Sequence, residues 1–273
     1  MAVVVALLGG VLWFEKLNAV QVVFLDVGQG DAVLISEGSN QILIDGGRDG
    51  KVLLEQLGAH MPFWDRQIEM VVATHPDEDH IGGLVSALET YHVGVLFRTE
   101  AASNTQAFKT LIREADIQRV QTINPFTGLV ARLPDAQLGT LFPRNAEDVS
   151  QAKDTNETSI VMRLIVGDVS FLLTGDLPSS REDRIDVGQT TVLKAGHHGS
   201  KYSTSESFLD RVKPEQAVLS VGADNRYGHP APEVLERLRQ HHIEIFRTDQ
   251  QGDISYVCPL PAHTCSVSVG RLR

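Results

Sequence analysis

The feature that most constrains this chain is a short segment crowded with potential metal ligands. Residues 75–80 read His-Pro-Asp-Glu-Asp-His and follow the apolar run Ile68–Ala73, which predicts a buried strand. Gly82 and Gly83 come next, near the predicted start of a helix. Imidazole nitrogens and carboxylate oxygens are the protein ligands that divalent cations prefer. The segment therefore predicts a metal-binding loop at a strand end, and the alternative is a solvated acidic loop with incidental histidines.

The four ligand-bearing positions of this loop divide between two cations. An extended loop directs alternate side chains to opposite sides. We therefore expect His75 and Asp77 to serve one ion, and Asp79 and His80 to serve a neighbouring one.

A second signal is Asp176, which follows Gly175 at the end of the predicted strand Val169–Thr174. A carboxylate in this position can bridge two ions held roughly 3.5–4 Å apart, as in two-metal hydrolases. An aspartate after an apolar run is more often an ordinary turn residue. Because this one falls between two histidine-bearing segments, we predict that it is the bridging ligand.

The third signal is the pair His197 and His198, which lies between Gly196 and Gly199 after the predicted strand Thr191–Ala195. Neighbouring side chains point apart, so the two rings do not easily ligate one ion. We assign His198 to the metal and His197 to the substrate phosphate or to protonation of the leaving group. The reverse assignment stays open.

These motifs together resemble the metallo-β-lactamase superfamily, and more narrowly the C-terminal domain of the ComEC family of competence DNA-uptake channels. The resemblance implies an αββα four-layer sandwich of two mixed β-sheets flanked by helices. It also implies an extracytoplasmic domain (periplasmic or at the cell surface) tethered to the cytoplasmic membrane, with the channel portion of the parent protein and single-stranded DNA as partners. The narrower resemblance rests on four segments: 24–31, 45–47, 227–230 and 247–252.

The chain departs from the general superfamily pattern at two positions. Asp77 stands where the usual loop has a second histidine, and Asn156 stands where a third histidine is usual. Asn156 is expected to be either a weak metal ligand or a substrate contact. The ion site that contains His75 is therefore rich in oxygen and poor in nitrogen, which favours manganese or magnesium over zinc. We predict two divalent ions, with Mn²⁺ first and Zn²⁺ or Mg²⁺ as alternatives, and no small organic cofactor.

Several further residues are weaker candidates. Asp45 is expected either to orient a metal ligand from behind or to be purely structural. Asp26 and Asp31 flank Gly28-Gln29-Gly30 near the expected site, but turn and cap roles explain them equally well. His229 could face the cleft, and neither tryptophan is predicted to stack bases. Basic residues that could contact phosphate are Lys194, Lys201 and Arg226.

The net charge of the chain bears on which kinds of nucleic-acid protein it can be. The formal net charge is −11, which disfavours a nucleic-acid binder that works through a broad cationic surface. Two divalent ions escape this argument because they supply positive charge locally. We therefore predict a metal-dependent nuclease or phosphodiesterase, with metal-activated water and with Asp79 orienting that water. The resemblance to the ComEC family implies that its substrate is DNA, specifically the strand that is not imported. The alternatives are hydrolysis of another phosphodiester, such as a cell-wall choline phosphate ester, and a catalytically weak docking module.

The chain ends carry two further predictions. Residues 1–16 begin with the apolar run Met1–Phe14, which is shorter than the ~20 residues of a spanning helix. It is interpreted as the remnant of a preceding membrane helix, or else as a buried terminal element, with the domain itself at 17–273. Near the other end, Cys258 and Cys265 lie seven apart, and a hairpin disulfide and two free thiols are equally open.

The predicted elements form two successive halves of strands with interleaved helices, which suits helices packed outside two sheets. Residues 143–155 are polar and are predicted to be a loop. The predicted helices are Lys51–Leu57, Ile81–Tyr91, Thr105–Ala115, Thr204–Val212 and Pro232–His241.

Overall fold

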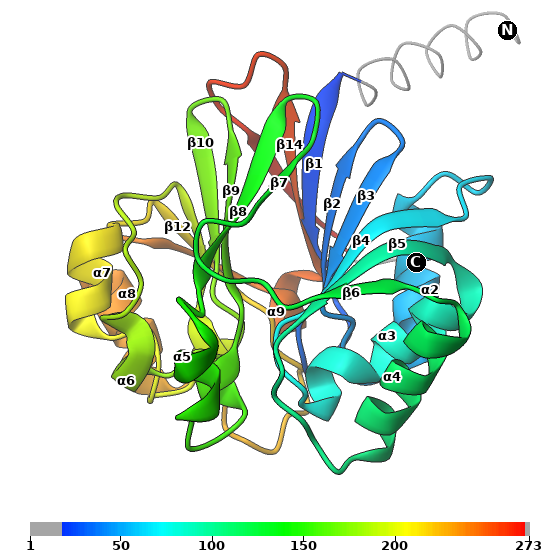
Figure 1. Ribbon diagram of the computed structural model, residues 1–273. Coiled ribbons are helices and arrows are strands. Elements are labelled where there is room, and N and C mark those ends of the chain that lie inside the picture. The colour runs from blue at the N-terminus through cyan, green and yellow to red at the C-terminus, as the bar shows by residue number, and fades with distance from the viewer. Residues whose placement is uncertain (1–17, 271–273) are drawn as a thin grey trace, which may run out of the picture.

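Two β-sheets pack face to face, with helices on the outer face of each (Figure 1). The structure is a computed structural model that describes residues 18–270. Both sheets contain parallel and antiparallel pairs, so the predicted αββα sandwich of mixed sheets is confirmed. The strand orders are β15-β14-β1-β2-β3-β4-β5-β6 and β13-β12-β11-β10-β9-β8-β7.

The eight-stranded sheet is covered on its outer face by three helices: α2 (Gly50–His60), α3 (Glu78–Thr90) and α4 (Gln106–Ile117). Strands β3 to β6 run parallel to one another, whereas the strands on the other side of β3 pair antiparallel. The strands are β1 (Ala19–Phe24), β2 (Val33–Glu37), β3 (Asn40–Ile44), β4 (Gln67–Ala73), β5 (His92–Arg98), β6 (Gln121–Ile123), β14 (Asp253–Pro259) and β15 (Ser266–Gly270).

The seven-stranded sheet carries shorter helices: α6 (Ser179–Glu182), α7 (Glu206–Val212) and α8 (Pro232–Gln240). Strands β10 to β13 are parallel, and β7 to β10 are antiparallel. The strands are β7 (Val130–Arg132), β8 (Ala136–Phe142), β9 (Val161–Val166), β10 (Val169–Leu173), β11 (Val192–Lys194), β12 (Gln216–Leu219) and β13 (Glu244–Arg247); α9 (Thr248–Gln251) precedes β14.

The core follows from the two-residue alternation of the strands. In β1, Val22 and Phe24 enter the cluster between the sheets, whereas Val23 enters the cluster beneath α2 and α3. Phe24 packs edge-on against Tyr256, and so does Phe171 from the opposite sheet. Burying each such side chain contributes roughly 1.5–3 kcal/mol to the free energy of unfolding. Because the central strands bury side chains on both faces, they join the two sheets on one face and the outer helices on the other.

The segment 143–155 is not the plain loop that was predicted. It contains the helix α5 (Ala146–Ser150), whose cap residue Asn145 accepts hydrogen bonds from the backbone N–H groups of Glu147 and Asp148. Asp148 is buried and pairs with two arginines. The prediction was wrong because this helix depends on a cap and ion pairs, and it has no apolar periodicity to reveal it.

The predicted apolar remnant at residues 1–16 lies outside the described residues. Within 18–270, none of the helices combines the length and apolarity needed to cross a bilayer.

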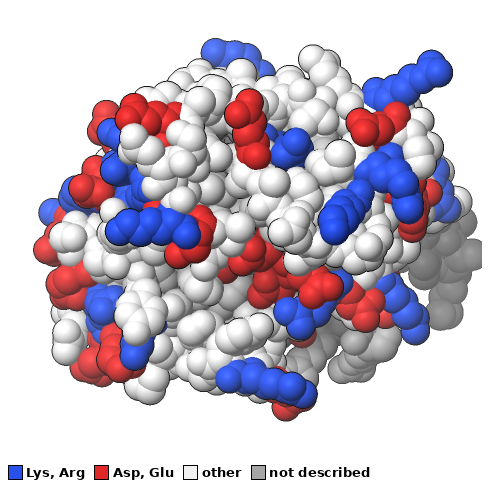
Figure 2. Space-filling model, turned by 60° about the horizontal axis from the view of Figure 1, so that its bottom comes forward, with Lys and Arg blue, Asp and Glu red and all other residues white. Residues whose placement is uncertain are grey.

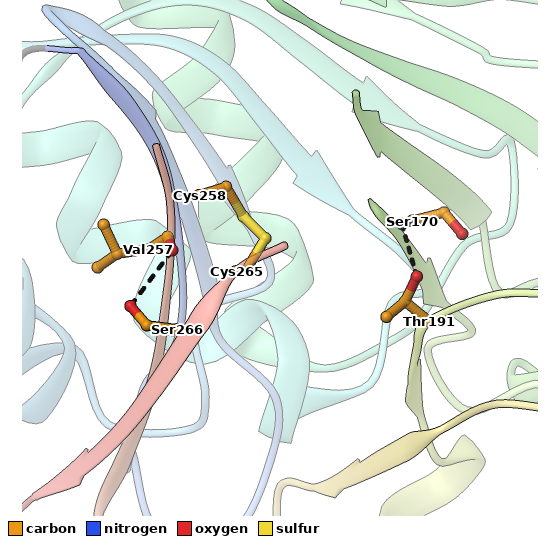
Figure 3. The surroundings of a disulfide bond; sticks show 6 residues. All are labelled: Ser170, Thr191, Val257, Cys258, Cys265 and Ser266. Atoms are coloured by element: carbon orange, nitrogen blue, oxygen red, sulfur yellow. Dashed lines mark hydrogen bonds between the residues drawn. A yellow bond between two sulfur atoms is a disulfide. The ribbon is translucent and has the colours of Figure 1, made fainter. Parts of the chain in front are cut away.

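The two cysteines form a disulfide, which decides between the two open predictions (Figure 3). Cys258 lies on β14 and is fully buried, and Cys265 precedes β15 and packs against the core between the sheets. Because β14 and β15 pair antiparallel, the bond closes a hairpin, as the short spacing allowed.

Candidate metal centre

The three predicted loops converge at one edge of the molecule, where β4, β10 and β11 end. The chain enters β1 at the top of Figure 1, and the ends of the parallel strands point to the bottom. The loop after β4 supplies residues 75–80, β10 is followed by Asp176, and β11 is followed by His197 and His198.

Asp176 lies at the centre of the cluster. One of its oxygens, Oδ2, is 3.2 Å from Nε2 of His80 and 3.3 Å from Nε2 of His198. The same His198 nitrogen is 3.7 Å from a carboxylate oxygen of Asp79. His75 lies beside His80, with ring centroids 4.1 Å apart, and its Nε2 is 3.7 Å from Asp77. Ligand atoms of His75, His80 and Asp176, and of Asp79, His80 and His198, form groups in which all atoms lie within 4.8 Å of one another.

Hydrogen bonds from behind orient two of the imidazoles. Nδ1 of His198 lies 2.9 Å from the carbonyl oxygen of Ser220, which can only accept, so this nitrogen carries the hydrogen. Nδ1 of His80 lies 2.7 Å from Asp45. In their neutral forms both rings therefore aim an Nε2 lone pair at the carboxylate of Asp176. Two acceptors that face each other need a proton or a metal cation between them, and a carboxylate or carbonyl behind each imidazole is the usual support of a metal-binding histidine.

The donor set fits two divalent ions on two further grounds. First, buried atoms of the cluster have no hydrogen-bond partner among the described residues, namely Nε2 of His75, His80 and His198 and Oδ1 of Asp176. Second, with neutral imidazoles the carboxylates outnumber the one ammonium, that of Lys194, by four, and two divalent ions carry the matching charge. The carboxylates counted are Asp31, Asp45, Asp77, Asp79 and Asp176.

The electrostatics of the cluster favour cations. Burial raises the pKa of Asp176, but His198 and His80 outweigh it and hold that pKa well below its usual range. Burial lowers the pKa of His198, but the carboxylates of Asp176 and Asp31 outweigh burial and raise the pKa to about 9. His75 differs, because burial and the neighbouring His80 lower its pKa to about 4. The His75 ring is therefore neutral near pH 7, which is the form that binds metal.

The backbone is strained at this site. His197 and His198 have φ angles of 48° and 55°, and Asp45 has a φ of 57°. Residues other than glycine rarely adopt this left-handed region, and each instance costs of order 1–3 kcal/mol. Close packing of the backbone requires glycine at position 30, because a Cβ there would lie 1.9 Å from the carbonyl oxygen of Asp79. Only glycine lets segment 28–31 pack against the metal loop.

Lys194 is not where the prediction placed it. Its ammonium was predicted to contact substrate phosphate, but the side chain is 2% exposed and lies 2.6 Å from Asp31, which is 3% exposed. The ammonium also donates to the carbonyl oxygens of Gly175 and Ala195. A lysine that satisfies two strand ends and a buried carboxylate is not available to substrate.

Asp31 is the residue that sequence reasoning undervalued. It was weighed as a turn or cap residue near the mouth, yet it lies inside the cluster, 3.3 Å from Nδ1 of His198. Burial raises its pKa, but Lys194 and His198 outweigh burial and lower the pKa to about 2. The available signal was a charged residue directly before the fully apolar start of a strand, Ala32-Val33-Leu34.

The remaining candidates lie at the edges of the cluster. Asp77 stands at the N-cap position of α3 without a side-chain capping bond, and its carboxylate accepts a hydrogen bond from the hydroxyl of Thr155, the residue before Asn156. His197 is 30% exposed, with Nε2 3.7 Å from Asp176, and His229 lies beside it, with ring centroids 5.6 Å apart. Lys201 and Arg226 are exposed. Figure 2 turns this edge forward and shows Asp and Glu side chains near the middle of the face, with Lys and Arg side chains around them.

The fold and this cluster define a class of protein. A family model described as the metallo-beta-lactamase superfamily matches residues 25–223, which is well over half of the chain. The chain belongs to the metallo-β-lactamase superfamily. Among solved structures, YhfI from Bacillus subtilis superposes with a TM-score of 0.54 at 12% identity, over 83% of this chain and 95% of that one. CmlA from Streptomyces venezuelae, a diiron β-hydroxylase, gives 0.56 at 12% identity, over 89% and 54%.

The curated relatives are more specific and confirm the resemblance to the ComEC family. The chain is 31% identical to ComE operon protein 3 of Bacillus subtilis over 86% of its own length and 33% of that protein. It is 31% identical to competence protein ComA of Neisseria gonorrhoeae, over 88% and 32%. It is 32% identical to recombination protein 2 of Haemophilus influenzae, over 89% and 30%. The chain thus spans about a third of the length of these relatives.

Proposed function

We propose that this domain hydrolyses phosphodiester bonds in DNA with two divalent cations, during competence-linked DNA uptake. The observation that carries the proposal is the convergence of three distant loops on Asp176, which brings imidazole nitrogens and carboxylate oxygens, the usual ligands of divalent ions, within 4.8 Å of one another. The names of the curated relatives supply the connection with competence.

The two ions would be held by different sets of residues. Asp79, His80 and His198 would hold one ion, while His75, Asp77 and Asn156 would hold the other, and Asp176 would contribute to both. Bound divalent ions would supply Lewis acidity, which makes a water more acidic and offsets charge on phosphoryl oxygens.

The chain's own residues would position the reactants. Asp79 is 18% exposed, more than Asp31 and Asp176, the other two carboxylates near His198, and it would orient the attacking water. The partly exposed His197 would donate a proton to a phosphoryl or leaving-group oxygen. Asp45 and Ser220 would hold the rings of His80 and His198 in place throughout.

We further propose manganese as the ion of the His75 set. Asp77 and Asn156 offer oxygen where the family usually offers imidazole nitrogen, and oxygen-rich sets suit manganese or magnesium.

The proposed location is extracytoplasmic, beside the membrane channel portion of the parent protein. The disulfide between Cys258 and Cys265 supports this side of the membrane, because disulfides persist in oxidising compartments.

The test is a cleavage assay on end-labelled single- and double-stranded DNA with Mn²⁺, Mg²⁺ and Zn²⁺ in turn. We expect manganese-dependent cleavage that EDTA stops and manganese restores. Hydrolysis of choline phosphate esters without DNA cleavage would replace the proposal with the cell-wall alternative. Binding of DNA without cleavage under any metal would replace it with the docking module.

A further inference from the structure

The segment between β12 and α8 forms a braced loop beside the candidate metal centre. One side chain, Asn225, spans it: its amide nitrogen donates to the carbonyl oxygens of Gly222 and His229, at 2.8 and 2.7 Å. Its amide oxygen accepts from the backbone N–H of His229 at 3.0 Å. Three hydrogen bonds from one residue hold the loop in a single arrangement.

This loop presents an aromatic ring to solvent. Tyr227 is 60% exposed, and its ring stacks on His229 with centroids 6.0 Å apart and an interplanar angle of 16°. His229 in turn adjoins His197, whose Nε2 lies 3.7 Å from the bridging Asp176. A continuous series of rings therefore leads from the surface to the candidate metal centre.

The charge of the chain makes such a ring significant. With a net charge of −11, the protein cannot gain nucleic-acid affinity from a broad cationic track. Stacking of bases on aromatic rings does not depend on net charge and contributes about 1–3 kcal/mol per base. An exposed, braced aromatic ring beside the metal centre supplies this kind of affinity.

We propose that Tyr227, supported by His229, stacks against an unpaired base next to the phosphodiester that is cleaved, so that the substrate is single-stranded nucleic acid. The inference rests on the proposed function and adds the residue that selects an unpaired strand. In a duplex each base face is covered by its neighbours, whereas an unpaired base exposes one. The supporting ring, that of His229, has a buried Nδ1 with no hydrogen-bond partner among the described residues.

A quaternary ammonium group also binds aromatic faces, so a choline ester is the competing occupant. Choline sites enclose the cation in a cage of several rings. Here the stacked pair offers one outward face, that of Tyr227, which suits a flat base better than a rounded cation.

The test measures binding of a fluorescein-labelled 12-nucleotide oligothymidylate to the full chain in the presence of Mn²⁺. Fluorescence anisotropy is recorded in a rapid-mixing instrument, before the strand is cut. We expect Tyr227→Ala to weaken binding about 5- to 150-fold, and Tyr227→Phe to bind like the wild type. The matched control is Phe63→Ala, which removes another exposed ring, 81% exposed. Phe63 lies before β4, at the end of that seven-residue strand remote from the metal loop, and its loss should leave binding unchanged.

A second variant reads stacking directly. In Tyr227→Trp the indole fluorescence should be quenched by the single strand and not by the same sequence as a duplex. Wild-type affinity in Tyr227→Ala would overturn the stacking role, and so would competition by millimolar phosphocholine that disappears in Tyr227→Ala. If Tyr227→Ala weakens binding but the wild type cleaves no DNA, the proposed function fails and the stacking site stands. If the wild type cleaves DNA but Tyr227→Ala binds the strand as tightly as the wild type, the stacking site fails and the proposed function stands.

Discussion

The buried ion pair between Lys194 and Asp31 leads to a prediction about stability that is easily refuted. Replacing Lys194 by methionine keeps the length and apolar stem of the side chain but removes the ammonium. Asp31 then stays 3% exposed among the carboxylates of the cluster, without the cation that lies 2.6 Å away in the wild type.

The magnitude follows from this burial. Removing one partner of a buried pair costs about 3–5 kcal/mol, because the remaining charge is desolvated and uncompensated. Lys194 is the strongest of the groups that lower the pKa of Asp31 to about 2 against the effect of burial. The Asp31 carboxyl should therefore take up a proton far more readily in Lys194→Met. The two carbonyl oxygens that accept from the ammonium, those of Gly175 and Ala195, lose a partner as well.

The assay is urea unfolding at pH 7 in EDTA, followed by far-ultraviolet circular dichroism. We expect Lys194→Met to lower the free energy of unfolding by about 3–5 kcal/mol. The double variant Lys194→Met with Asp31→Asn should recover at least about 1 kcal/mol, because neither charge then remains. A loss below about 1 kcal/mol, or losses that simply add in the double variant, would refute the view that this pair is a buried, mutually dependent unit.

The remaining predictions concern the metal centre, the disulfide and acid stability. Asp79→Asn should reduce DNA cleavage at least 100-fold while the circular dichroism spectrum stays that of the wild type; retained turnover would remove Asp79 from the mechanism. Asp45→Ala should weaken manganese binding about 10- to 100-fold by isothermal titration calorimetry, because the support of a metal-binding imidazole is lost. Replacing Cys258 and Cys265 by alanine should lower the free energy of unfolding by about 2 kcal/mol, the entropy of a short closed loop; an unchanged urea midpoint would contradict this. Burial raises the pKa of Asp148, but two arginines outweigh burial and lower it to about 2, so its contribution of roughly 2 kcal/mol is present above pH 5 and lost as the pH falls toward 2. Asp148→Asn should therefore destabilise the protein at pH 7 and make little difference near pH 2, which urea unfolding at both pH values would show.

Local patterns in the sequence were sufficient for the fold and for the ligand-bearing loops. Alternating apolar residues specify which face of each strand is buried, because a shift of one residue would turn every side chain over. The histidines and aspartates of the metal loop are recognisable because four potential metal ligands within six residues after a buried strand are uncommon. These signals lie within a few neighbouring residues, and the chain alone displays them.

Tertiary structure decided the partners that lie far apart along the chain. Lys194 carries the same charge as an exposed lysine, and only its burial beside Asp31, which precedes β2 in the other half of the fold, removes it from the substrate's reach. His197 and His198 are adjacent and chemically identical. The carbonyl oxygen of Ser220 holds the ring of His198 inward, while His197 stays partly exposed. A residue's charge and type are written in the sequence, but its desolvation and its hydrogen-bond partners come from strands that meet only when the two sheets pack.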